Sequence, residues 1–124
     1  MNKRNISIIG GAGHVGFPLG LIFSSKGFKV SLIDKDKKNI KKINNGEIPF
    51  LEEHSKKLLS SMIKKGKIYA TDQINEISKS KYIIICIGTP ITNQLNPNLK
   101  PFLNFFDNLK TKIKKDQIII IRSS

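Results

Sequence analysis

Three glycines near the N-terminus have a spacing that can bind phosphate. Gly11, Gly13 and Gly16 form a G-x-G-x-x-G pattern, which follows a short apolar run and precedes residues with helical periodicity. In such a loop the first glycine permits a tight turn, the second lets the backbone approach a pyrophosphate, and the third lets the helix pack close to the strand. The free N–H groups at the helix N-terminus then attract the phosphates. Alone, the pattern also fits a plain turn, so its context decides.

An acidic residue stands where a dinucleotide-binding loop needs one. Asp34 ends a second apolar run, 18 residues after Gly16. Its carboxylate would accept hydrogen bonds from the adenosine ribose, and it would repel a 2′-phosphate by about 1–4 kcal/mol at about 4 Å. This predicts NAD as the cofactor in preference to NADP. The alternative is that Asp34 only caps a turn, and the adjacent Lys35 would soften the charge discrimination.

Strand and helix signals alternate along the chain and position these residues. Short apolar runs predict strands at 5–10, 29–34, 67–70, 82–87 and 117–122. Helical spacing of apolar residues predicts helices at 14–26, around 40–43, at 51–65, at 74–77 and at 102–113. Thr71 or Asp72 is the expected N-cap of the short helix at 74–77.

This alternation predicts an α/β fold, a Rossmann-type doubly wound parallel sheet with helices on both faces. We expect about five strands in the order 3-2-1-4-5, with ligand bound at the carboxyl edge above the first and fourth strands. Residues 1–124 are expected to form one NAD-binding domain. The sheet is expected to be truncated at its fifth strand, whose uncovered edge is a candidate association surface.

The net charge of +13 raises the question of nucleic acid, but the lysines argue against it. All but two of the 22 basic residues are lysines, and pairs such as Lys37-Lys38 and Lys64-Lys65 fall between apolar residues at helical spacing. Solvated helix faces explain that pattern, so nucleic acid is not an expected partner. A lysine-rich nucleic-acid-binding protein stays a distant alternative, recognisable by DNA binding that weakens as salt rises.

Metal sites, disulfides and membrane segments are not expected. Cys86 is the single cysteine, and His14 and His54 lie far apart, so no metal-ligand cluster is predicted. The uncharged segment 6–23 holds five glycines and a proline, which argues against a membrane span or a signal peptide. A cytoplasmic protein is expected.

Further motifs resemble the UDP-glucose/GDP-mannose dehydrogenase family. In chain order they are Gly16-Phe17-Pro18-Leu19-Gly20, Asp34-Lys35-Asp36, Asn45-Gly46-Glu47-Ile48-Pro49 with Glu52, Ile87-Gly88-Thr89-Pro90 and Arg122-Ser123-Ser124. The resemblance covers the whole chain but only the NAD-binding domain of the family. Leu95-Asn96-Pro97 and Arg122-Ser123 are most similar to the UDP-N-acetylmannosamine dehydrogenase-like branch.

The chain also departs from that family. Glu52-Glu53-His54 stands where the family commonly has Glu-Pro-Gly, and Ser123-Ser124 stands where it has Ser-Thr. A second family, the extended short-chain dehydrogenases that include sugar epimerases, shares the opening Gly10-Gly11-Ala12-Gly13. The Tyr-x-x-x-Lys pair that those enzymes need is absent from this sequence.

The resemblance implies an oxidoreductase that converts the C6 alcohol of a nucleotide-diphosphate sugar to a carboxylate with two NAD. The family's nucleophilic cysteine, its supporting lysine, its central linker helix and its sugar-binding domain correspond to positions beyond Ser124. We therefore expect no catalytic residue in this chain and no turnover by it alone. The alternative is a non-catalytic NAD-binding module or gene fragment that needs a partner chain; a homo-oligomer is also compatible.

Cofactor contacts are expected from the glycine loop, the acid and the end of the fourth strand, namely Gly11, Gly13, His14, Val15, Gly16, Asp34, Thr89 and Pro90. For Thr89 and Pro90 the alternative is a plain strand-terminating turn. Ser123 and Ser124 are expected to order water or cofactor. His14 is interpreted as a non-catalytic loop residue near the cofactor, and Cys86 as an inert core thiol in the middle of a strand.

Overall fold

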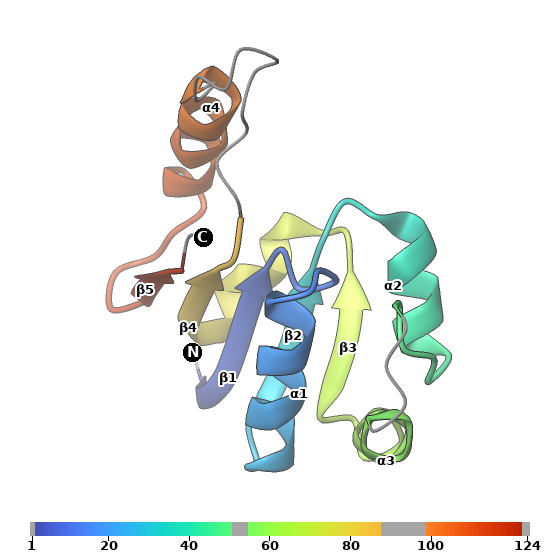
Figure 1. Ribbon diagram of the computed structural model, residues 1–124. Helices are drawn as coiled ribbons and strands as arrows, with labels where there is room; N and C mark the ends of the chain where they lie inside the picture. Colours follow the sequence, from blue (N-terminus) through green and yellow to red (C-terminus); the bar gives the residue numbers. More distant parts are fainter. Residues whose placement is uncertain (1, 51–54, 88–98, 123–124) are drawn as a thin grey trace.

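Five parallel strands form a single sheet in the order β3-β2-β1-β4-β5 (Figure 1). The computed structural model describes residues 2–50, 55–87 and 99–122. The strands are β1 (Asn2–Ile9), β2 (Lys29–Ile33), β3 (Ile68–Thr71), β4 (Ser80–Ile85) and β5 (Ile118–Ile121). The predicted Rossmann-type order is confirmed, and β1 lies in the centre with β2 and β4 as its neighbours.

The helices connect these strands, and capping residues and glycines mark some of their ends. They are α1 (Gly16–Ser25), α2 (Lys37–Asn44), α3 (Lys56–Lys64), the 3₁₀ helix η1 (Ile74–Lys79) and α4 (Leu99–Lys110). Asp36 caps α2 by accepting a hydrogen bond from the Asn39 N–H at 3.0 Å. Gly27 and Gly46, both with positive φ, follow the ends of α1 and α2.

The expected N-cap of η1 is wrong. Gln73 is the residue that precedes η1, and no side chain caps it. Thr71 belongs to β3 instead, and its hydroxyl accepts a hydrogen bond from the Gln73 N–H at 3.1 Å. The sheet therefore continues one residue further than the apolar run suggested.

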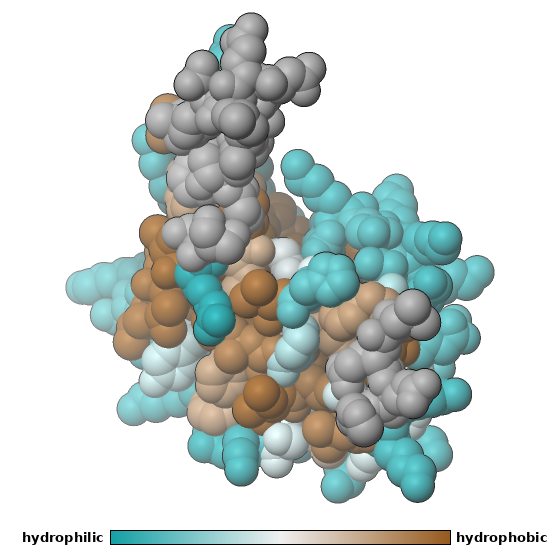
Figure 2. Space-filling view, in the orientation of Figure 1, coloured by the Kyte–Doolittle hydropathy of each residue, from teal (hydrophilic) through white to brown (hydrophobic). Residues whose placement is uncertain are grey.

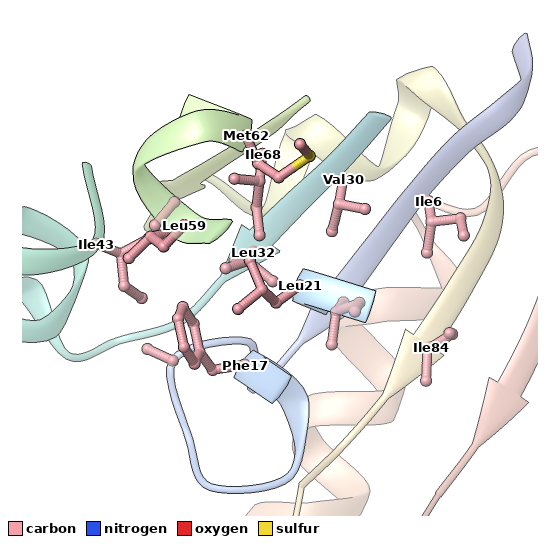
Figure 3. Packing of buried hydrophobic residues seen from close by; sticks show 13 residues of the cluster. Ile6, Phe17, Leu21, Val30, Leu32, Ile43, Leu59, Met62, Ile68 and Ile84 are labelled. Carbon is pink, nitrogen blue, oxygen red and sulfur yellow. The ribbon is translucent and has the colours of Figure 1, made fainter. Parts of the chain in front are cut away.

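Helices cover both faces of the sheet, as predicted, and each face has its own core. Alternate residues of a strand point to opposite faces. On one face Ile8 and Leu32 pack in one cluster with residues of α1 and α3. Figure 3 shows Leu32 of this cluster with Phe17 of α1 and Leu59 of α3. The other core joins strand isoleucines to η1 and α4, with buried residues Ile9, Ile33, Ile77, Ile83, Ile85 and Leu109. The glycine loop lies above the first of these cores.

The edge strand β5 is apolar and exposed. Its four isoleucines retain between 38% and 58% of their accessible surface. Figure 2 shows apolar surface spreading over the face of the molecule that carries α1 and the β4–β5 edge. The expectation that this edge associates with another chain stays a prediction.

A polar network lies within the sheet, away from the glycine loop. The Ser7 hydroxyl is 2.7 Å from the hydroxyls of both Ser31 and Ser80, and all three residues are buried. The Tyr69 hydroxyl donates a 2.6 Å hydrogen bond to Glu76 of η1. Burial, followed by this hydrogen bond and the carboxylate charge, raises the pKa of Tyr69 from 10.0 to about 12, and a bond with Ser31 opposes the rise.

This network gives a pH-dependent contribution to stability. The Tyr69 hydrogen bond is the main cause that holds the pKa of Glu76 below its ordinary value. The contribution of Glu76 is thus present above the unfolded carboxyl pKa and lost as pH falls through the folded one. The contribution of Tyr69 is present below pH 10.0 and lost as pH rises toward about 12.

We expect Tyr69→Phe to lower the free energy of unfolding by about 1 kcal/mol at neutral pH, a modest value because the pair is only partly buried. The difference from wild type should shrink as pH falls through the lowered pKa of Glu76, because its carboxylate then becomes protonated. Urea unfolding at several pH values measures it. A difference that stays constant from neutral to acidic pH would contradict the Tyr69–Glu76 assignment.

Candidate dinucleotide-binding site

The glycine loop connects the carboxyl end of β1 to α1 and is fixed to β2. The N–H groups of Gly10 and Gly11 both donate to the Ile33 carbonyl, at 2.8 and 3.1 Å. The Gly13 N–H turns back to the Gly10 carbonyl at 3.3 Å, and the Phe17 N–H reaches the Gly13 carbonyl at 3.0 Å. The predicted strand–loop–helix context of the motif is therefore present.

The three motif glycines differ in what surrounds them. A Cβ added at Gly11 would lie 2.7 Å from Leu32 Cβ, and one at Gly16 would lie 2.3 Å from the Gly10 carbonyl oxygen. At Gly13 the nearest such contact is an ordinary 3.5 Å. Gly11 and Gly16 are thus required by the fold itself, whereas the backbone at Gly13 is open to a ligand.

Two further glycines support the loop and were not singled out individually in the sequence. Gly10 has φ +81°, and a Cβ there would lie 2.3 Å from the Cys86 carbonyl oxygen. Gly20 lies one helical turn after Gly16, and a Cβ added there would lie 2.6 Å from Leu32 Cδ2. Both glycines allow α1 and the loop to approach the sheet closely. In the sequence, the Gly10-Gly11 pair and the spacing of four between Gly16 and Gly20 could have indicated this role.

The N-terminus of α1 offers hydrogen-bond donors. No described residue accepts a hydrogen bond from the backbone N–H of His14, Val15 or Gly16. Val15 occupies the N-cap position without a side-chain cap, and the first turn of α1 carries no acidic residue. His14 and Val15 are both exposed. Unpaired N–H groups and the positive end of the helix dipole together suit an anion such as a pyrophosphate.

Asp34 contacts the glycine loop directly. It follows β2, is half-buried, and its Oδ2 accepts a hydrogen bond from the Ala12 N–H at 2.9 Å. Its Oδ1 accepts one from the Asp36 N–H at 3.0 Å, so Asp34 also caps the turn before α2. A carboxylate has about four acceptor positions, which leaves capacity for ribose hydroxyls. The turn-capping role and the ribose-binding role are therefore compatible.

An aromatic residue that sequence reasoning missed lies against the loop. The Phe50 ring centroid is 4.3 Å from that of His14, with the two planes inclined at 32°. Phe50 also makes an edge-on contact with Phe17, at 5.7 Å and 90°. Its only sequence signal was its place directly after the Asn45–Pro49 motif.

Cys86 is a half-buried thiol in the part of the chain that the structure describes. It packs against the first core, and burial raises the pKa of its thiol, while the charge of Arg122 opposes the rise. The predicted mid-strand position is wrong, because β4 ends at Ile85 and Cys86 follows it. The Cys86 N–H still donates to the Ile9 carbonyl at 2.8 Å. This bond holds Cys86 beside the glycine loop, where its carbonyl oxygen faces Gly10. The predicted packing role is confirmed, with Cys86 partly buried against this core.

Other predicted residues lie outside the part of the chain that is described. Thr89, Pro90, Ser123, Ser124 and Glu52 are among them, so their roles stay predictions. Within the described ranges, no group of three or more His, Cys, Asp or Glu side chains could hold a metal ion. None of the described helices combines the length and apolar character that a membrane crossing requires.

A five-stranded parallel sheet with a glycine loop after β1 and an acid after β2 defines a Rossmann-type dinucleotide-binding domain. Residues 4–124 match the family model of the UDP-glucose/GDP-mannose dehydrogenase family, NAD binding domain. The chain therefore belongs to this family.

Individual relatives are consistent with that assignment. The UDP-glucose 6-dehydrogenase of Rickettsia felis is 30% identical over 97% of this chain and 27% of its own length. The structure of the UDP-N-acetylmannosamine dehydrogenase of Pyrococcus horikoshii superposes with a TM-score of 0.84 at 28% identity, covering 96% of this chain and 28% of that one. A ternary complex of GDP-mannose dehydrogenase from Pseudomonas aeruginosa superposes with a TM-score of 0.83 at 25% identity, covering 95% of this chain and 28% of that one. The chain thus spans little more than a quarter of these relatives.

Proposed function

We propose that this chain binds NAD at the carboxyl edge of β1, β2 and β4 and serves as the cofactor-binding domain of a nucleotide-sugar dehydrogenase. The observation that carries the proposal is the contact between Asp34 and the Ala12 N–H, which places the acid against the glycine loop. Loop, helix N-terminus and acid are the three parts that dinucleotide recognition needs.

The described residues fit the chemical parts of NAD. The N–H groups of His14, Val15 and Gly16 would hold the pyrophosphate, and the open backbone at Gly13 would let it approach. Asp34 would accept hydrogen bonds from the adenosine ribose. When bound, NAD supplies a hydride acceptor; the residues of this chain bind and orient it.

The reaction we propose is the oxidation of the C6 alcohol of a nucleotide-diphosphate sugar to a uronate. The names of the relatives support this substrate class. The single cysteine of the chain is the half-buried Cys86, so a covalent step of this reaction would need a nucleophile from other residues, in the same polypeptide or in a partner chain. We place the protein in the cytoplasm, with residues 1–124 as its NAD-binding domain and Thr89, Pro90, Ser123 and Ser124 facing the cofactor.

The selectivity for NAD over NADP tests this proposal. The carboxylate of Asp34 would lie near the 2′-phosphate of NADP, and repulsion of about 1–4 kcal/mol predicts at least about fivefold weaker binding of NADP. Calorimetric titration of the purified chain with each dinucleotide measures both affinities. Equal affinities, or a preference for NADP, would contradict the role of Asp34, and binding of neither would contradict the proposed function.

A further inference from the structure

The segment between α2 and α3 reaches across to the glycine loop through one side chain. Phe50 lies 17 residues after Ile33, the last residue of β2, yet its ring packs on His14 with centroids 4.3 Å apart. Its other contact, edge-on to Phe17, anchors it, because Phe17 is fully buried in the first core. Phe50 therefore connects an exposed residue of the loop to a fixed part of the fold.

Few side chains restrain the part of the loop that Phe50 supports. The Gly13 N–H makes a long 3.3 Å hydrogen bond to Gly10, and Val15 has no side-chain cap. Among the described residues, no side-chain hydrogen bond or ion pair holds the turn 13–16, and its one aromatic ring contact is the stacking of His14 on Phe50. This turn carries the N–H groups that we assign to the pyrophosphate.

We propose that Phe50 and His14 are a pair of positioning residues that hold the phosphate-binding turn in the conformation that accepts the dinucleotide. This inference rests on the proposed function and adds to it Phe50 and a role for the His14 side chain. A turn that is already ordered loses less conformational entropy on binding, so the stacked pair raises affinity without touching the ligand through Phe50. Aromatic pairs contribute about 0.5–1.5 kcal/mol, which corresponds to about two- to tenfold in affinity.

A double-mutant cycle on NAD affinity tests the pair. We expect His14→Ala and Phe50→Ala each to weaken NAD binding by about three- to tenfold, and the double variant to bind about as well as the weaker single variant, because both changes remove one contact. His14→Phe keeps the stacking and should bind NAD within about twofold of wild type. Calorimetry measures the four variants and the wild type.

Phe28→Ala is the matched control for any loss of folding stability. Phe28 is also half-buried, packs against the same core, and makes an edge-on ring contact, with Phe23 at 5.8 Å. It lies at the opposite end of α1 from the loop. We expect Phe28→Ala to lower the melting temperature as Phe50→Ala does and to leave NAD affinity within about twofold of wild type.

Adenosine, which lacks the pyrophosphate, separates positioning of the turn from a general defect in the site. Its affinity should be unchanged in His14→Ala and Phe50→Ala. Additive losses in the double variant, or a His14→Phe variant as weak as His14→Ala, would overturn the inference, the latter because it would assign the effect to the polar imidazole. Wild-type binding of NAD with unchanged variants would overturn this inference alone, whereas a wild-type chain that binds no NAD would overturn the proposed function as well.

Discussion

The Gly16→Ala variant should be strongly destabilised, whereas Gly13→Ala should fold normally and lose NAD. At Gly16 the added Cβ would lie 2.3 Å from the Gly10 carbonyl oxygen and 3.0 Å from Gly11 Cα, and neither backbone atom can move without displacing the loop. Overpacking of this kind costs about 3 kcal/mol of unfolding free energy, or more. Urea unfolding of the two variants and the wild type measures the loss.

At Gly13 the same methyl group would meet nothing nearer than 3.5 Å. Because φ is not in the left-handed region at Gly13, the stability of Gly13→Ala should equal that of wild type or exceed it by up to about 1 kcal/mol. The methyl group would stand where the pyrophosphate approaches, so NAD affinity should fall by at least about tenfold. A Gly13→Ala chain that binds NAD like wild type would show that the ligand does not approach the loop here.

The second large effect is expected at Asp34. Asp34→Ala removes two hydrogen bonds that hold the backbone of Ala12 and Asp36, and it removes the carboxylate assigned to the ribose. Hydrogen bonds to charged groups contribute about 1.5–3 kcal/mol, so NAD affinity should fall by at least about tenfold. NADP should lose less, because the repulsion of its 2′-phosphate disappears, and the ratio of the two affinities should approach one.

Asp36→Ala is the control for a charge removed from the same turn. Asp36 caps α2 through the Asn39 N–H, so this variant should lose about 1 kcal/mol of stability. Its selectivity for NAD should change much less than that of Asp34→Ala. A similar loss of selectivity in both variants would show that the general charge of the turn, and not Asp34, discriminates between the dinucleotides.

Features with a local signal were predictable from the sequence. Neighbouring residues alone indicate the glycine spacing, the acid after the second apolar run and the alternation of strands and helices. The strand order then follows from the rules for parallel sheets. The bond from Asp34 to the Ala12 N–H was not predicted, because it depends on how far the two loops extend beyond their strands.

Features that depend on packing between distant segments were missed or misplaced. Phe50 reads in the sequence as one more apolar residue, and only the folded chain brings it to His14. Cys86 stands within a continuous apolar run, yet β4 ends at Ile85. Thr71 resembles an N-cap, but pairing of β3 with β2 draws it into the sheet.

The most direct test of the account is a titration of the ¹⁵N-labelled chain with NAD, followed by amide chemical shifts. We predict saturable shifts at the N–H groups of Ala12, His14, Val15 and Gly16, since these line the assigned pyrophosphate and ribose contacts. Shifts confined to the lysine-rich helices α2 and α3, and lost as salt rises, would indicate nonspecific attraction of an anion to a basic surface. That result would contradict a dinucleotide site at the glycine loop.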